Sequence, residues 1–411
     1  MKSFSLFTIV LLCAAILLVD SVAFYWLQSI IQFVDSTVFK TLIYTLFWVF
    51  TVGLIVSILV LKITLDNINP TRKQVLISRF YGLGVLSFVP KLAFIIVISI
   101  LYFTNFLFSQ DKSLIIIPII GVLSGFLPFF TILYGIFKAI YRFKVYHHTI
   151  ENNRLPTAFN GLKIVQISDL HLGSFNYKYK KLENAIEKIN ALKPDYIFIT
   201  GDLVNNYAWE LRGWDSVFKQ LEAKEGKYAI LGNHDYGDYS LWETPESKQE
   251  NFEEIKKFFN TIDFKLLLNE SKIITKNTDK IALIGVENWG KPPFKQYGEL
   301  EKAMKGVEAI SFKILLSHDP THWAEEVKDK TDITLTLAGH THGMQAGFQY
   351  KNLQWSPIKY KFKHWAGLYQ HKTQYLYVNR GLGWLGFPAR IGMRPEITFI
   401  KLKTLLSDKK E

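Results

Sequence analysis

The chain has 411 residues and a formal net charge of +12, with 48 Lys and Arg against 36 Asp and Glu. This length predicts two domains, since a typical domain holds roughly 100–200 residues. The single cysteine, Cys13, excludes an intrachain disulfide and a thiolate zinc site. No nucleic-acid partner is expected, because no basic cluster is interleaved with a recognisable binding motif.

The first 147 residues predict a transmembrane region. They contain long apolar runs and only four acidic residues against eleven Lys and Arg, a net charge of +7 that leaves +5 for the rest of the chain. A helix needs about 20 apolar residues to cross a bilayer. Four stretches meet that length, at approximately residues 4–27, 41–61, 80–108 and 114–137.

Two of these spans leave alternatives open. Pro90 and Lys91 interrupt the third, which favours a shorter span over 92–108 with 80–89 at the interface, or a Lys91 side chain that snorkels. The first span could be a cleaved signal peptide, because Ser21-Val22-Ala23 is a small-x-small pattern. Its single amino-terminal charge and long apolar stretch favour an uncleaved helix.

The distribution of Lys and Arg predicts the orientation of the spans, since cytoplasmic loops carry an excess of both. The loop after span one holds only Lys40, and the loop after span three holds only Lys112. Both termini are therefore expected in the cytoplasm. The basic residues that set this orientation follow spans two and four: Lys62, Arg72, Lys73, Arg79, Lys138, Arg142 and Lys144.

After a linker at 148–161, residues 162–405 predict one α/β domain, followed by a charged tail at 406–411. The alternation of short apolar runs with helical spacing is typical of such folds. A helix is expected at 179–191, where three apolar residues share one face. Strands are expected at 162–167, 196–200, 227–231, 312–316 and 333–338.

Each of these five strands ends directly before a block of polar residues. In layered α/β folds, sites form outside the carboxyl ends of strands, so the five blocks are expected to converge. A lone Gly-Asp or Gly-Asn-His-Asp is more often a turn, but the ordered set is specific. The blocks supply Asp169 and His171, Asp202, Asn233 with His234 and Asp235, His318, and His340 with His342.

Carboxylates and imidazoles in this number predict a site for two divalent metal ions. Such ligands suit Mn, Fe or Zn, whereas an all-oxygen set would suggest Mg or Ca. Two ions about 3.5–4 Å apart can hold an attacking hydroxide and neutralise a phosphoryl group. Asp202 is the candidate for a bridging ligand, because it follows a glycine that permits a tight turn.

The ordered blocks resemble the calcineurin-like metallophosphoesterase superfamily over about residues 162–398. The resemblance implies a four-layer α/β/β/α sandwich. It also implies a first metal held by Asp169, His171, Asp202 and His342, and a second held by Asp202, Asn233, His318 and His340. His234 would act as the acid that protonates the leaving group, oriented by Asp235.

Four further segments are similar to the membrane-anchored bacterial YkuE/YaeI-like phosphodiesterase branch. Met344 departs from that branch, which usually has a second glycine there, and this puts the loop shape and substrate access in doubt. The segments are 339–345, 359–369, 379–383 and 394–397.

The resemblance implies a hydrolase of phosphomonoester, phosphodiester or pyrophosphate bonds that uses a metal-bound hydroxide, with Mn as the favoured metal. It would reside in a bacterial inner membrane with its catalytic domain in the cytoplasm. A lipid-linked substrate such as UDP-2,3-diacylglucosamine is a candidate, since related enzymes cleave it. The alternative is a membrane sensor or interaction protein, whose phosphoesterase domain is regulatory or acts on a soluble nucleotide.

Two features suggest how substrate is bound. Arg380 follows a predicted strand and could clamp a phosphate with two hydrogen bonds, or form a structural ion pair. Lysines and aromatic residues between His342 and Arg380, with the apolar run 384–388, could form a phospholipid-binding rim. The alternative for this region is a hairpin with a packed loop.

Overall fold

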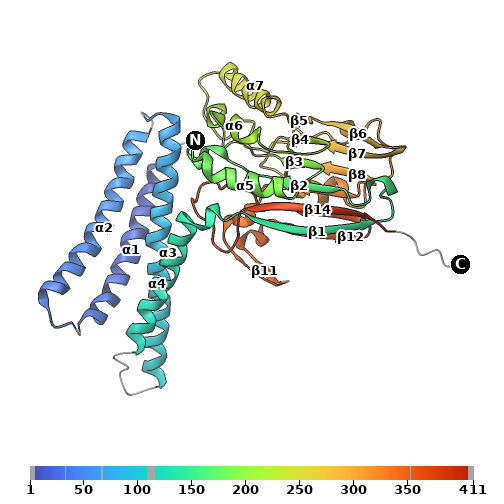
Figure 1. The fold of residues 1–411 in the computed structure, drawn as a ribbon. Coiled ribbons are helices and arrows are strands. Elements are labelled where there is room, and N and C mark those ends of the chain that lie inside the picture. The colour runs from blue at the N-terminus through green and yellow to red at the C-terminus, as the bar shows by residue number, and fades with distance from the viewer. Residues whose placement is uncertain (1–4, 33, 66–67, 109–115, 352, 406–411) are drawn as a thin grey trace. The chain divides into compact units, whose positions relative to one another are not determined.

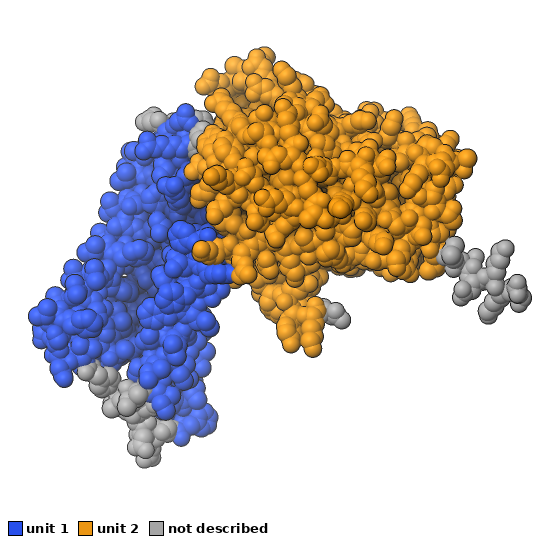
Figure 2. All heavy atoms as spheres, viewed as in Figure 1, with its two compact units in different colours: residues 1–137, 386–389 blue, residues 138–385, 390–411 orange. Residues whose placement is uncertain are grey.

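The computed structural model describes residues 5–32, 34–65, 68–108, 116–351 and 353–405. The charged tail expected at 406–411 lies outside these described residues. The chain forms two compact units, coloured separately in Figure 2. The first unit holds Met1–Phe137 and Gly386–Ala389, and the second holds Lys138–Leu385 and Arg390–Glu411.

The first unit consists of long apolar helices. In the described part of the chain, four helices have the length and composition to cross a membrane. Ser5 and Ser36 cap the first two helices, because their hydroxyls accept the backbone N–H groups of Thr8 and Phe39. The helices are α1 (Leu6–Ile31), α2 (Thr37–Thr64), α3 (Pro70–Phe108) and α4 (Ile116–Phe137) (Figure 1).

The third helix differs from expectation, because α3 runs without a break through Pro90 and Lys91. Its charge is compensated inside the unit. Lys91 Nζ donates to Asp20 Oδ2 of α1 at 2.7 Å and to Ser87 Oγ at 3.1 Å. Asp20 also accepts the Thr51 hydroxyl of α2. A paired ammonium does not need to reach the interface, so the helix continues past it.

The second unit contains two six-stranded sheets, whose order the hydrogen-bond pairing defines. One sheet has the order β1-β14-β2-β3-β4-β5, and β2, β3 and β4 within it are parallel. Its strands are β1 (Lys144–Asn152), β2 (Lys163–Ile167), β3 (Tyr196–Thr200), β4 (Gly226–Ile230), β5 (Lys265–Leu266) and β14 (Glu396–Thr404).

The other sheet has the order β12-β13-β9-β8-β7-β6, in which β7, β8, β9 and β13 are parallel neighbours. A separate hairpin pairs β10 (Phe348–Tyr350) with β11 (Leu353–Trp355). The six strands are β6 (Glu270–Lys276), β7 (Asp279–Gly285), β8 (Lys313–Leu316), β9 (Leu335–Ala338), β12 (Gly367–His371) and β13 (Gln374–Val378).

Helices and apolar clusters build layers around these sheets. Between the sheets lies a cluster that includes Ile164, Phe198 and Ile314. The helices α5 (Tyr179–Ala191), α6 (Asp215–Phe218) and α7 (Pro245–Thr261) pack on the outer face of the first sheet. On the outer face of the second lie α8 (Leu300–Met304) and a short π-helical turn, Trp323–Val327. The predicted four-layer α/β/β/α sandwich is confirmed.

The segment that begins the second unit is partly a strand, and differs from the linker expected at 148–161. Residues up to Asn152 form β1, which pairs in parallel with β14 from Lys144↔Glu396 to Asn152↔Thr404. The alternation of exposed and buried residues in this strand is weak, and Ile150 is its only fully buried apolar side chain. Its pairing therefore comes from a partner strand 252 residues further along the chain, which the local pattern does not reveal.

Candidate metal centre

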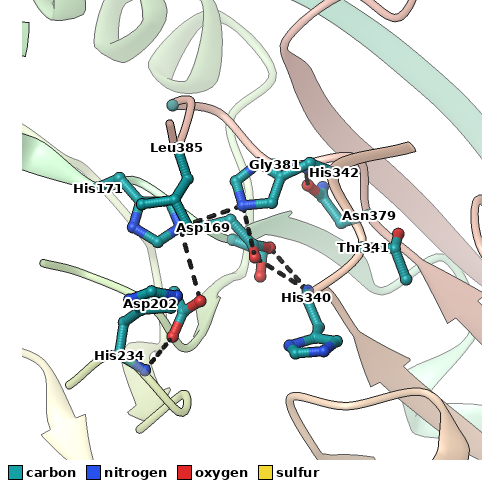
Figure 3. Close-up of polar contacts among 12 residues, drawn as sticks. Asp169, His171, Asp202, His234, His340, Thr341, His342, Asn379, Gly381 and Leu385 are labelled. Carbon is teal, nitrogen blue, oxygen red and sulfur yellow. Dashed lines mark hydrogen bonds and ion pairs between the residues drawn. The ribbon is translucent and has the colours of Figure 1, made fainter. Parts of the chain in front are cut away.

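The five polar blocks follow five strands that end at one edge of the sandwich. Asp169, Asp202 and Asn233 come after β2, β3 and β4, which are parallel neighbours in one sheet. His318 and His340 come after β8 and β9, which are parallel neighbours in the other. Figure 3 shows how Asp169, His171, Asp202, His340 and His342 gather from these loops.

Hydrogen bonds across the two sheets hold the blocks together. His318 Nδ1 donates to the carbonyl of Thr200 at 2.7 Å, although the two residues belong to different sheets. The backbone N–H of His340 donates to Asp169 Oδ1 at 2.9 Å (Figure 3). These contacts fix the distance between the loops of one sheet and those of the other.

The backbone at the site adopts conformations that L-residues usually avoid. Asp169, His171, Asp202, His340 and His342 all have φ between 46° and 73°. Non-glycine residues are uncommon in this left-handed region, and such strain clusters at functional sites.

Close approach of the loops explains the glycine before Asp202. A Cβ atom at Gly201 would lie 2.5 Å from the backbone nitrogen of Gly232 and 2.7 Å from His318 Nδ1. No side chain fits in that space, so the position requires glycine.

Two groups of buried side chains could each hold a metal ion. Asp169, His171 and His342 form one group, and Asp202, His318 and His340 form the other. In the first, His342 Nε2 lies 3.1 Å from His171 Nε2 and 3.3 Å from Asp169 Oδ1.

Asp202 belongs to the second group but also lies close to the first, and Asn233 adds an amide oxygen to the second group. Oδ2 of Asp202 is 3.6 Å from His171 Nε2 and 3.2 Å from His318 Nε2. Asn233 Oδ1 is 2.8 Å from His340 Nδ1, so the amide joins the second group.

The hydrogen-bond pattern tests whether these residues fit metal ions. His171 Nδ1 donates to the carbonyl of Val204 at 3.1 Å, which leaves Nε2 with a lone pair that faces His342. His318 Nε2 is buried and lies 3.2 Å from Asp202 Oδ2, while its Nδ1 donates to Thr200. Buried ring nitrogens that face carboxylates, with the other ring nitrogen held by a backbone carbonyl, are what a divalent cation requires, so the residues fit.

Burial and the charges of neighbouring groups together set the electrostatics of the site. Burial lowers the pKa of His171 to about 3 and that of His340 to about 4, so both imidazoles are neutral, as metal ligands must be. Burial raises the pKa of Asp169 to about 7. Burial would also raise the pKa of Asp202, but His318 and His234 beside it hold that pKa well below its usual range. Burial would lower the pKa of His318, but the Asp202 carboxylate raises it to about 10, so a metal ion at this site would displace the proton of His318. Opposite charges within hydrogen-bond reach favour the ionised form.

His234 is held differently from the arrangement that the family resemblance implies. Its Nδ1 donates to the carbonyl of Asn205 at 2.7 Å, and its backbone N–H donates to Asp202 Oδ1 at 2.9 Å. Among the described contacts, Asp235 does not reach the His234 ring. Its carboxylate accepts the backbone N–H groups of Asp202, Leu203, Val204 and Gly232. The role of Asp235 as an orienting residue is therefore corrected: it organises the loop that carries Asp202.

Arg380 also differs from the phosphate clamp considered for it. The guanidinium is buried, donates to Glu396 Oε2 at 2.5 Å and to Gln354 Oε1 at 3.1 Å, and stacks over the Tyr146 ring. Among its described contacts, none is with the metal-group side chains. The structural ion pair, which was the alternative, replaces the clamp, because a charge already paired in the interior is not available to a substrate.

Trp384 likewise does not lie on an exposed rim. Its side chain is 4% exposed and packs against Phe175 at 4.6 Å and Tyr141 at 5.8 Å between ring centroids. Trp384 therefore belongs to the apolar core, and for this residue the packed loop is correct and the exposed rim is not.

Three residues near the site were not found from the sequence. Arg390 is fully buried, and its Nη2 lies 3.5 Å from His342 Nδ1. Tyr239 accepts the Asn233 amide at 2.9 Å, and its ring lies 4.6 Å from that of His234.

The third is Glu210, a buried carboxylate that accepts backbone N–H groups from Gly173 and from Asn205, Asn206 and Tyr207. None of the three lies in a ligand block. Tyr239 lies five residues after His234, close to a block in the sequence, but an aromatic residue there has no pattern that marks it.

Comparison with known proteins agrees with this geometry. Residues 162–344 match the family "Calcineurin-like phosphoesterase", and residues 4–140 match "Probable Calcineurin-like phosphoesterase, transmembrane domain". The chain is 32% identical to the uncharacterised metallophosphoesterase YkuE of Bacillus subtilis over 264 residues, which cover 62% of this chain and 84% of that protein.

Two further relatives are an animal protein and a bacterial protein, and the second alignment covers more of this chain. A Danio rerio transmembrane protein with a metallophosphoesterase domain is 31% identical over 279 residues, 66% of this chain and 60% of that protein. An uncharacterised metallophosphoesterase of Helicobacter pylori is 28% identical over 344 residues, 82% of this chain and 84% of that protein.

Fold, site and membrane helices together define a membrane-anchored hydrolase of phosphoric esters. The resemblance seen in the sequence is confirmed: the chain belongs to the calcineurin-like metallophosphoesterases.

Proposed function

We propose that the protein is a dinuclear-metal-dependent phosphoesterase. Asp169, His171, Asp202 and His342 would hold one ion, and Asp202, Asn233, His318 and His340 the other. The observation that carries this proposal is the position of Asp202, whose Oδ2 lies 3.6 Å from a nitrogen of the first group and 3.2 Å from one of the second. A carboxylate so placed can serve both ions.

When bound, the two ions would lower the pKa of a water molecule and neutralise charge that develops on the phosphoryl group. The protein's own residues supply the remaining functions. Burial lowers the pKa of His342 well below its usual range, and the positive charge of Arg390 behind the ring lowers it further, so that imidazole is neutral. Neutral His342 presents a lone pair to the site.

His234 is the proposed proton donor to the leaving group. A carbonyl oxygen can only accept, so the hydrogen bond to Asn205 fixes one proton on Nδ1, and it is the imidazolium form, with a second proton on Nε2, that would pass the Nε2 proton to the leaving-group oxygen. The Tyr239 ring covers one side of the imidazole at 4.6 Å. Both contacts restrict the ring to one orientation, which general acid catalysis requires.

The proposed substrate is a lipid-linked phosphoester, pyrophosphates included, taken from the cytoplasmic face of the inner membrane. The four apolar helices support a membrane-derived substrate. The placement of Lys and Arg after the second and fourth helices supports the cytoplasmic orientation. Between residues 333 and 395 the chain carries no acidic residue, and Lys351, Lys359, Lys361 and Lys363 in that stretch are exposed, which favours an anionic substrate.

A metal and activity measurement on the purified full-length protein tests the mechanism. With Mn²⁺ loaded, Asp202→Asn should lose bound metal by mass spectrometry and lose hydrolysis of bis-p-nitrophenyl phosphate. His234→Asn should keep its metal while kcat falls by about 10²–10⁴-fold. Glu254→Gln, at an exposed position of α7, is the matched control and should leave both unchanged. Wild-type metal content and activity in Asp202→Asn would refute the dinuclear proposal.

A second measurement tests the substrate class. Total membrane lipid extract is incubated with wild-type protein and with Asp202→Asn, and the products are compared by mass spectrometry. We expect one phosphorus-containing lipid class to decrease only with the wild type. If no lipid changes while the chromogenic ester is cleaved, the mechanism stands and the lipid substrate is rejected in favour of a soluble one.

A further inference from the structure

The β10–β11 hairpin is an exposed element outside the two sheets. Among the described strands, β10 and β11 pair with each other alone, and Gln354 of β11 accepts a hydrogen bond from Arg380. In Figure 1 the β11 strand extends beyond both sheets, and the same part of the second unit stands out from the surface in Figure 2. A hairpin alone is marginally stable in water, so a projecting one needs a reason to persist.

The apolar side chains of this region are exposed to an unusual degree. Tyr350 is 69%, Leu353 63% and Tyr360 78% exposed. Among the described residues of the second unit, half of the large hydrophobic side chains with high exposure lie between Met344 and Tyr360. A concentration of this kind marks an interaction site rather than scattered surface residues.

Lysines are interleaved with these apolar residues. Lys351, Lys359, Lys361 and Lys363 are all exposed, and no acidic residue occurs between 333 and 395. Lys351 Nζ lies 5.6 Å from the centroid of the Tyr350 ring, and Lys359 Nζ lies 5.3 Å from that of Tyr360. The Tyr350 and Tyr360 rings therefore each have a lysine ammonium close by, from the next or the preceding residue. This is the composition that binds the interface of an anionic bilayer.

The hairpin is also joined to the candidate metal centre. β10 begins six residues after His342. Ser356, directly after β11, donates from its hydroxyl to the carbonyl of Gly343 at 2.9 Å. Gly347 donates its backbone N–H to Ile391, next to Arg390, at 2.9 Å. Both ends of the hairpin are thus tied to residues that border His342.

We propose that residues 348–351 and 353–361, which belong to the β10–β11 hairpin and the turn after it, bind the surface of an anionic lipid bilayer. The membrane helices of the same chain keep the second unit within reach of a bilayer, because α4 ends at Phe137 and β1 begins at Lys144. The apolar tips enter the headgroup region and the lysines contact lipid phosphates. The contact positions the loop that carries His342 at the interface, where a lipid phosphoester lies. Membrane binding itself does not depend on the catalytic proposal.

Fluorescence of a labelled full-length protein in lipid nanodiscs tests the contact. In a Cys13→Ser background, Tyr350→Cys and Leu353→Cys carry an environment-sensitive dye, and Glu254→Cys on α7 is the control. Figure 1 shows α7 and β11 at opposite edges of the unit. We expect the dye at 350 and 353 to shift its emission to the blue and to be quenched by headgroup-spin-labelled lipid. Both effects should be stronger in phosphatidylglycerol than in phosphatidylcholine. The dye at 254 should show neither effect.

A charge series separates lipid binding from other causes of burial. Lys351→Gln, Lys359→Gln and Lys361→Gln should each reduce the phosphatidylglycerol-dependent quenching at position 353 by about fivefold, and added salt should act in the same direction. Equal dye behaviour at 350 and 254 in both lipids would overturn the proposal. So would shielding at 350 that persists in lipid-free micelles and grows with protein concentration, since that indicates contact between copies of the chain.

Discussion

Replacing Lys91 with methionine should destabilise the membrane helices far more than replacing both members of the ion pair. Lys91 Nζ and Asp20 Oδ2 are 2.7 Å apart, which at an effective dielectric constant of about 20 corresponds to an attraction of about 6 kcal/mol. Desolvation of the two ions offsets most of it. Lys91→Met leaves the Asp20 charge buried with Thr51 as its remaining donor, so we expect a loss of about 3–5 kcal/mol.

The double variant Asp20→Leu, Lys91→Met removes both charges and should lie within about 1 kcal/mol of the wild type, or be more stable by about 1–4 kcal/mol. Thr51 keeps a partner in it, because its hydroxyl also donates to the carbonyl of Phe47 at 3.1 Å. The free energy of opening is measured by hydrogen exchange of α1 and α3 peptides in the full-length protein. Lys62→Met, in the last turn of α2, is the control. Equal losses in the single and double variants would refute the buried-pair reasoning.

Two further substitutions test how the site is held. Tyr239→Phe removes the hydroxyl that accepts the Asn233 amide but keeps the ring beside His234, so metal affinity measured by titration should fall by about 10–100-fold with little loss of thermal stability. Glu210→Gln replaces one carboxylate oxygen, which accepts backbone N–H groups, with an NH₂ group that cannot accept them. The free energy of unfolding should fall by about 1–3 kcal/mol. Because Asn205 contacts both residue 210 and His234, kcat should also fall, at unchanged metal content. Unchanged metal affinity in Tyr239→Phe, or unchanged kcat in Glu210→Gln, would remove that residue from the positioning scheme.

The strands and the residues of the candidate metal centre could be predicted from the sequence because both follow from local rules. Each of the five short apolar runs is a strand, and each is followed at once by its polar block. Parallel strands place their carboxyl ends at one edge of a sheet, so Asp169, Asp202 and Asn233 could be expected to meet although 31 to 64 residues separate them. The chemistry of carboxylates and imidazoles then indicates metals.

The contacts that orient these residues could not be predicted, because they depend on packing between distant segments. Nothing local distinguishes Arg380, which pairs with Glu396, from Arg390, which lies beside His342. Trp384 was equally ambiguous, since an apolar residue in a loop can face lipid or core. The fully paired Lys91 illustrates the same limit in the membrane, because its partner Asp20 lies on another helix.

The position of β14 between β1 and β2 sets the order in which the second unit can form during synthesis. β1 ends at Asn152, yet the strand it pairs with begins at Glu396. At roughly 5–20 residues per second, a ribosome needs about 12–50 s to make the chain between them. During that interval β1 has no strand to pair with and β2 is the open edge of the sheet, and unpaired strands and open edges pair readily with other chains. Completion of the first sheet therefore waits until β14 has been synthesised, and a chain truncated before β14 would expose β1 to aggregation and proteolysis.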